Sequence, residues 1–77
     1  MSPAVSDDEE TGIHCRLDEL LERRKMTLTR LSELVGVSIV NLSVLKNDRA
    51  RAIRFSTLSA ICRALECEVG DLLVVAD

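Results

Sequence analysis

The stretch Met26–Arg49, MTLTRLSELVGVSIVNLSVLKNDR, carries the clearest structural pattern in this 77-residue chain. Apolar residues recur at helical spacing on both sides of Gly36, which predicts two short amphipathic helices, the second at about Ile39–Lys46. Thr27 and Ser38 are suited to cap the N-termini of these helices. Gly36 can adopt the positive φ that a tight turn requires. The stretch therefore predicts a helix, a glycine turn and a second helix.

Further helices are predicted on both sides of this unit. Leucines at helical spacing indicate one helix over about Leu17–Lys25, and another begins near Ser56 or Thr57. A last helical turn is expected around Val69–Leu72. Weaker strand patterns occur at the two ends, in Gly12–Arg16 and in Leu72–Ala76. The two ends could pair as a short antiparallel ribbon that joins the termini of an all-α domain.

The composition indicates a single small domain with an aliphatic core. Hydrophobic residues make up 47% of the chain and charged residues 30%, but there is one Phe and neither Trp nor Tyr. The near absence of aromatic residues argues against a protein that binds single strands by base stacking. Residues 1–12, which are acidic and contain no base, are expected to form a disordered tail ahead of a folded domain at 13–77.

The charge is distributed unevenly along the chain. The net charge is −3, which is unusual for a protein that binds nucleic acid. Residues 22–54, however, hold eight basic and three acidic residues, so the positive charge surrounds the predicted helix pair. Many DNA-binding proteins place such a helix–turn–helix unit in the major groove. The distribution therefore favours binding to double-stranded DNA, with an affinity that depends strongly on salt.

Other functions receive little support from the sequence. With one His, no Gly-rich phosphate loop and no predicted pocket, the chain lacks the parts of an enzyme, and no cofactor is expected. His14, Cys15, Cys62 and Cys67 could be counted as four zinc ligands, but their spacing is poor, with no C-x₂-C pair. The cysteines are better explained as small buried apolar residues. The polar N-terminus and the absence of a long apolar run suggest a cytoplasmic, nucleoid-associated protein without a membrane partner.

From Ile13 to its end, the chain resembles the small Xre-type regulators of the lambda repressor/Cro helix-turn-helix family, in particular their short single-domain bacterial branch. The matching segments are LDELL at Leu17–Leu21, LSELVGVS at Leu31–Ser38, NLSVLKN at Asn41–Asn47, AIRFSTLSAICRAL at Ala52–Leu65 and GDLL at Gly70–Leu73. The resemblance implies a five-helix lambda repressor-like fold with an N-terminal and a C-terminal strand. It also implies transcription regulation through double-stranded DNA, with the third helix in the major groove.

The resemblance also implies which residues contact DNA. Base contacts would come from the third helix, at Ile39, Val40, Ser43 and Val44. Phosphate contacts would come from the start of the second helix, the end of the third and the following loop, at Thr27, Leu28, Lys46, Asn47, Arg49, Arg51 and Arg54. Repressors of this kind usually bind as dimers, and a homodimer through the C-terminal strand or the fifth helix is expected.

The third helix departs from the family in its side chains. Many relatives carry a polar residue at Leu28, Arg or Gln at Ile39 and a basic residue at Val44, whereas all three are apolar here. Arg, Lys, Asn and Gln are the side chains that form hydrogen bonds to G and A. Val40 and Val44 could instead contact thymine methyl groups. Alternatively, the apolar patch could bind a protein, as in an accessory or antitoxin-like module, or the helix could rotate and bury Ile39.

Overall fold

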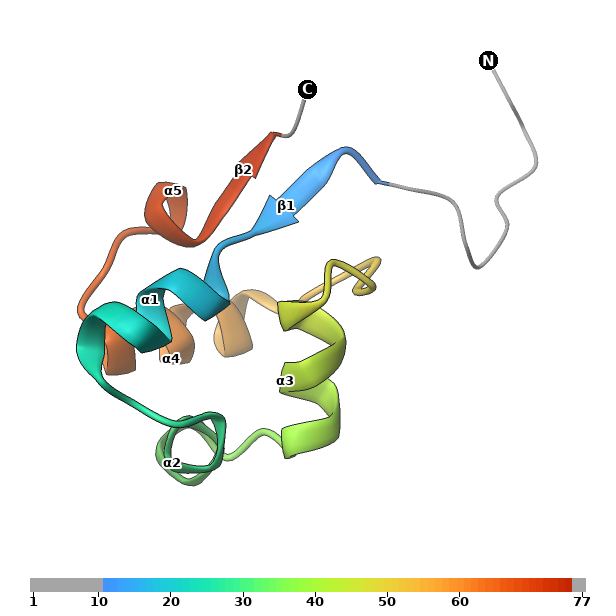
Figure 1. The fold of residues 1–77 in the computed structure, drawn as a ribbon. Helices are drawn as coiled ribbons and strands as arrows, with labels where there is room; N and C mark the ends of the chain where they lie inside the picture. The colour runs from blue at the N-terminus through green and yellow to red at the C-terminus, as the bar shows by residue number, and fades with distance from the viewer. Residues whose placement is uncertain (1–10, 76–77) are drawn as a thin grey trace, which may run out of the picture.

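The computed structural model describes residues 11–75, which fold into five helices and two short strands (Figure 1). The elements follow one another as β1 (Ile13–Cys15), α1 (Leu17–Arg24), α2 (Leu28–Val35), α3 (Ile39–Lys46), α4 (Phe55–Leu65), α5 (Val69–Leu72) and β2 (Leu73–Val75). The predicted fold class is therefore confirmed. Apart from Thr11 and Gly12, which are exposed, the predicted acidic tail lies outside the described residues.

The predicted caps form at the central two helices. The Thr27 hydroxyl accepts a hydrogen bond from the Arg30 N–H at 3.0 Å. The Ser38 hydroxyl accepts one from the Asn41 N–H at 3.1 Å. Between them, α2 ends at Gly36, which has a φ of 74° and donates its N–H to the Ser32 carbonyl. Local side-chain chemistry thus determines where α2 ends and α3 begins.

The start of α4 differs from its prediction. The helix begins at Phe55, and Arg54 occupies the N-cap position without a side-chain cap hydrogen bond. Ser56 and Thr57, one of which was expected to begin the helix, both lie within its first turn. The prediction was wrong because Ser and Thr are common N-caps but are also accommodated within a helix.

The core consists of aliphatic side chains and two cysteines. Every helix contributes to it, and the described part of the chain buries no charged or polar residue. The members are Cys15, Leu17, Leu20, Leu21, Leu31, Leu42, Leu45, Leu58, Ile61, Cys62, Leu65 and Leu72. Helix α4 buries four residues along one face, whereas α2 buries Leu31 alone and leaves Leu34 exposed. Helix α3 is attached to this core by two buried side chains, Leu42 and Leu45.

The predicted terminal ribbon is present. Strands β1 and β2 pair antiparallel, with Ile13 opposite Val75 and Cys15 opposite Leu73. The Arg16 N–H extends the connection by donating to the Leu72 carbonyl at 2.7 Å. Two strands are marginal on their own, so the ribbon depends on the helices beneath it (Figure 1).

We expect Gly36→Ala to lower the free energy of unfolding by about 1–2 kcal/mol, because a residue with a Cβ is strained at this positive φ. No atom lies within 4 Å of the added Cβ, so strain in the backbone is the whole cost. Urea unfolding measures the change. Gly70→Ala is the matched control, since its Cβ also meets open space but its backbone φ is not positive. Equal effects of the two substitutions would contradict this explanation of the turn.

Candidate nucleic-acid interface

The turn between α2 and α3 sets the two helices at 117°. This angle lies within the range typical of a helix-turn-helix. The turn is also held by a side chain, because the Ser32 hydroxyl donates to the Val37 carbonyl at 2.6 Å. No single helix in residues 11–75 is long and apolar enough to cross a membrane. Only α2 and α3 taken together pass that test, and this bend separates them.

Helix α3 exposes the face that was predicted to contact bases. Leu42 and Leu45 are buried behind it, whereas Val40 is 71% exposed, Ile39 44% and Val44 37%. The alternative in which the helix rotates and buries Ile39 is therefore wrong. The exposed face is apolar at its centre, and Asn41 and the half-buried Ser43 supply the polar groups beside it.

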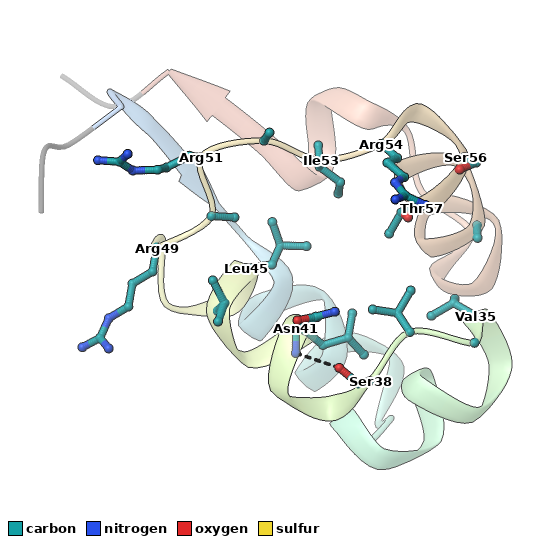
Figure 2. Close-up of a pocket in the computed structure, with 17 residues that line it drawn as sticks. Val35, Ser38, Asn41, Leu45, Arg49, Arg51, Ile53, Arg54, Ser56 and Thr57 are labelled. Atoms are coloured by element: carbon teal, nitrogen blue, oxygen red, sulfur yellow. Dashed lines mark hydrogen bonds between the residues drawn. The ribbon is translucent and has the colours of Figure 1, made fainter. Parts of the chain in front are cut away.

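A groove of about 760 Å³ lies beside this face (Figure 2). One wall is α3 with Asn41 and Val44, and the other is the segment after α3 together with the first turns of α4. Figure 2 shows Arg49 and Arg51 extending outward from the loop and Arg54 lying beside Thr57. The lining of the groove therefore includes three arginines of the segment between α3 and α4.

The remaining predicted phosphate contacts are spread over several elements. Thr27 is exposed at the start of α2, and Leu28 is half-buried against the core, so its backbone N–H is the polar group it can offer. The Asn47 amide donates to the Ser43 hydroxyl at 3.4 Å. Lys46 is paired with another helix, since its Nζ lies 3.6 Å from the Asp18 carboxylate of α1. Of the predicted phosphate contacts, the three loop arginines line the groove beside α3, whereas Thr27, Leu28, Lys46 and Asn47 are not among its lining residues.

Asp48 has a structural role that no pattern in the sequence indicates. This residue follows α3 with a φ of 61°, and its carboxylate accepts a hydrogen bond from the Cys15 N–H at 2.7 Å. Its other oxygen lies 2.7 Å from Nδ1 of His14. The hydrogen bond from Cys15, and then that from His14, hold the pKa of Asp48 below its ordinary value. Asp48 therefore connects the end of α3 and the start of the basic loop to β1.

The residues once counted as zinc ligands are divided between two regions. His14 and Cys15 belong to β1, where they contact Asp48, whereas Cys62 and Cys67 line a groove near α5. Nowhere in residues 11–75 do three or more His, Cys, Asp or Glu side chains form a group that could hold a metal. The spacing of five positions would place Cys62 and Cys67 on different faces of one continuous helix, but no such helix forms. Helix α4 ends at Leu65, and the Cys67 N–H then donates to the Cys62 carbonyl at 2.9 Å.

The five-helix fold, the angle between α2 and α3 and the exposed face of α3 define a helix-turn-helix DNA-binding domain. The chain belongs to the Cro/C1-type HTH DNA-binding domain family, which it matches over residues 16–77. It is thus the DNA-binding domain of a transcriptional regulator, in a family that is not enzymatic.

Two relatives illustrate this membership. The chain is 60% identical over 62 residues to the uncharacterized HTH-type transcriptional regulator YozG of Bacillus subtilis (strain 168), covering 80% of this chain and 74% of YozG. The crystal structure of the transcriptional regulator VanUg superposes with a TM-score of 0.69 at 28% identity, and the match covers 92% of this chain and 93% of VanUg.

We expect Asp48→Asn to lower the free energy of unfolding at pH 7 by about 1 kcal/mol, since Asn tolerates positive φ but lacks the charge. The pKa of Asp48 is lower in the folded than in the unfolded protein, so its contribution is present above the unfolded pKa of about 4. That contribution is lost as the pH falls through the folded pKa. Urea unfolding over a series of pH values should show the difference between wild type and variant shrinking in acid.

The matched control for this experiment is Asp18→Asn. Its carboxylate is exposed and pairs with Lys46 at 3.6 Å, so we expect a loss below about 0.5 kcal/mol. A difference between wild type and Asp48→Asn that stays constant as the pH falls would show that the carboxylate charge does not stabilise the junction.

Proposed function

We propose that the protein regulates transcription by binding double-stranded DNA sequence-specifically, with α3 in the major groove. The observation that carries this proposal is the placement of an exposed α3 face next to a groove bordered by Arg49, Arg51 and Arg54. A helix that enters the major groove needs cationic or N–H groups on either side of it, because half or more of protein–DNA hydrogen bonds go to phosphate and sugar.

In this proposal Ile39, Val40, Ser43 and Val44 contact base edges. Valine and isoleucine side chains can pack against thymine methyl groups but cannot accept or donate hydrogen bonds. Ser43, with Asn41 beside it, supplies the polar contacts. Each bidentate side-chain pair that is missing forgoes about 1–3 kcal/mol of discrimination, so we expect modest specificity with a preference for thymine.

The proposed phosphate contacts are Arg49, Arg51 and Arg54 of the loop, Thr27 and Leu28 at the start of α2, and Lys46 and Asn47 at the end of α3. The first turn of α4 adds a further group. Because no side chain caps this helix, the N–H groups of Ser56 and Thr57 are open to a phosphate oxygen beside Arg54. The proposed phosphate contacts thus come from α2 before α3 and from the loop and α4 after it.

The exposed Ile39, Val40 and Val44 also favour a second candidate, a protein-interaction module on a fold that no longer recognises DNA. The two functions differ in what the arginines do. In a DNA-binding protein the arginines neutralise phosphates and release counterions, whereas an apolar protein contact centred on α3 does not require them.

We expect the double substitution Arg49→Ala, Arg51→Ala to weaken binding to all duplex sequences about equally. If both residues contact phosphates, the slope of log K against log salt should become shallower by about 2, since each neutralised phosphate contributes about 0.9. Fluorescence anisotropy with labelled duplexes at several salt concentrations measures both quantities.

Arg23→Ala is the matched control, because Arg23 carries the same charge but lies exposed at the end of α1, outside the groove. It should leave the salt slope nearly unchanged. If wild-type protein binds no duplex at low salt, the DNA-binding proposal fails and the protein-interaction module is favoured.

A further inference from the structure

Thr11, the first described residue, lies beside the loop that carries the arginines. A cavity of about 170 Å³ separates the start of β1 from this loop, and its lining includes Thr11, Ile13 and Arg51. Arg51 also lines the groove beside α3, as do its neighbours Ala50 and Ala52 (Figure 2). The cavity and the groove therefore share a wall. The residues that precede Thr11 begin next to the proposed phosphate contacts.

Asp48 fixes the position of Thr11 relative to the loop arginines. Its carboxylate accepts the Cys15 N–H at 2.7 Å, and its other oxygen lies 2.7 Å from Nδ1 of His14. Arg49 follows directly, and its N–H donates to the Val44 carbonyl at the end of α3 at 2.9 Å. Strand β1 and the loop are thus joined at one point. The folded domain therefore determines how far the arginines lie from Thr11.

The sequence ahead of Thr11 carries the opposite charge to the loop. Residues 7–10, which we call the acidic segment, are Asp7, Asp8, Glu9 and Glu10. The chain spans at most about 3.6 Å per residue, so Asp7 can lie up to roughly 14 Å from Thr11, and Glu10 is its direct neighbour. The acidic segment is therefore long enough to reach the loop. Its tether keeps it there at an effective concentration on the order of millimolar.

The loop arginines suit carboxylates as well as phosphates. Arg49 and Arg54 form no ion pair with any residue in 11–75. A guanidinium group forms charge-assisted hydrogen bonds to a carboxylate in the same forked geometry that it uses for a phosphate. One arginine side chain cannot make both contacts with the same N–H groups. A carboxylate at the loop and a DNA phosphate therefore exclude each other.

We propose that the acidic segment binds the loop arginines of its own chain and competes with DNA for them. The proposal rests on the proposed function for its consequence, because the competitor is the DNA backbone, whereas the contact itself needs no DNA. Since the segment occupies phosphate-binding groups and not the face of α3, it should lower the affinity for every duplex by about the same factor.

The double substitution Glu9→Gln, Glu10→Gln in the full chain tests the competition. We expect it to raise the affinity for a short random-sequence duplex at least about threefold at about 0.1 M salt, because two exposed ion pairs are lost from the free protein. The gain should shrink as the salt concentration rises. Fluorescence anisotropy measures both effects, and an unchanged affinity would overturn the proposal.

Glu22→Gln, Glu66→Gln is the matched control, because it removes the same two charges from exposed side chains that line neither the groove beside α3 nor the cavity. It should change the affinity less than about twofold, since charges farther than a Debye length from the site are largely screened. An equal gain in both variants would show that net charge alone acts, and it would overturn the proposal.

A double-mutant cycle tests whether the loop arginines are the site. In the Arg49→Ala, Arg51→Ala background, Glu9→Gln, Glu10→Gln should no longer raise the affinity, because the segment has lost its partners. A gain as large as that in the wild-type background would contradict a contact between the segment and these arginines.

Nuclear magnetic resonance measures the contact without DNA. In ¹⁵N-labelled full chain, the backbone amide signals of residues 49–54 should shift between wild type and Glu9→Gln, Glu10→Gln but not in the control variant. The shifts should be the same at all protein concentrations, because the segment is tethered. Unchanged signals would overturn the proposal. Shifts that grow with concentration would also overturn it, since the segment would then bind a second copy.

The two measurements separate this proposal from the proposed function. If the amide signals shift but no duplex is bound at low salt, the contact exists and the proposed function fails alone. If a duplex is bound but the signals and the affinity are both unchanged by Glu9→Gln, Glu10→Gln, the contact is wrong and the proposed function stands.

Discussion

A positive φ at Gly36 and the hydrogen bond from Ser32 to the Val37 carbonyl together set the direction in which α3 leaves α2. The core cannot do this alone, because α3 buries only Leu42 and Leu45 and the core formed by residues 11–75 contains no aromatic side chain. Asp48 holds the other end of α3 by accepting the Cys15 N–H of β1. The helix is therefore positioned at both of its ends by short polar contacts, and its face opposite Leu42 and Leu45 is left exposed.

Local chemistry explains which features could be predicted from the sequence. Caps at Thr27 and Ser38 and the turn at Gly36 depend on residues within a few positions of one another, so their patterns are visible in the sequence. The resemblance to lambda repressor-like regulators then supplied the arrangement of all five helices, and the family match confirms it. The assignment of individual DNA contacts stays a prediction, since side-chain roles vary more than the fold does.

The unpredicted features depend on residues far apart in the sequence or on competition between two local preferences. Asp48 meets Cys15 across 33 positions, and Lys46 meets Asp18 on another helix, and no periodicity records either contact. Helix α4 could have begun at Ser56 or Thr57, but it begins at Phe55 and leaves that side chain exposed. The environment of Cys67 also depends on how the chain folds. The chain turns after Leu65 and brings Cys67 next to Cys62, and burial and this neighbour raise the pKa of the Cys67 thiol to about 11.

In the proposed interface, the residues that supply affinity for DNA differ from those that supply sequence specificity. The loop arginines supply attraction to any duplex, and the apolar face of α3 supplies a discrimination that depends on thymine methyl groups. In this division, sequence discrimination depends on apolar contacts, whereas recognition helices commonly use Arg, Lys, Asn or Gln. Selection of binding sites from a random duplex library tests it most directly. We expect an enriched motif with thymines at fixed positions, whereas recovery of duplexes without any enriched motif would contradict recognition through the apolar face of α3.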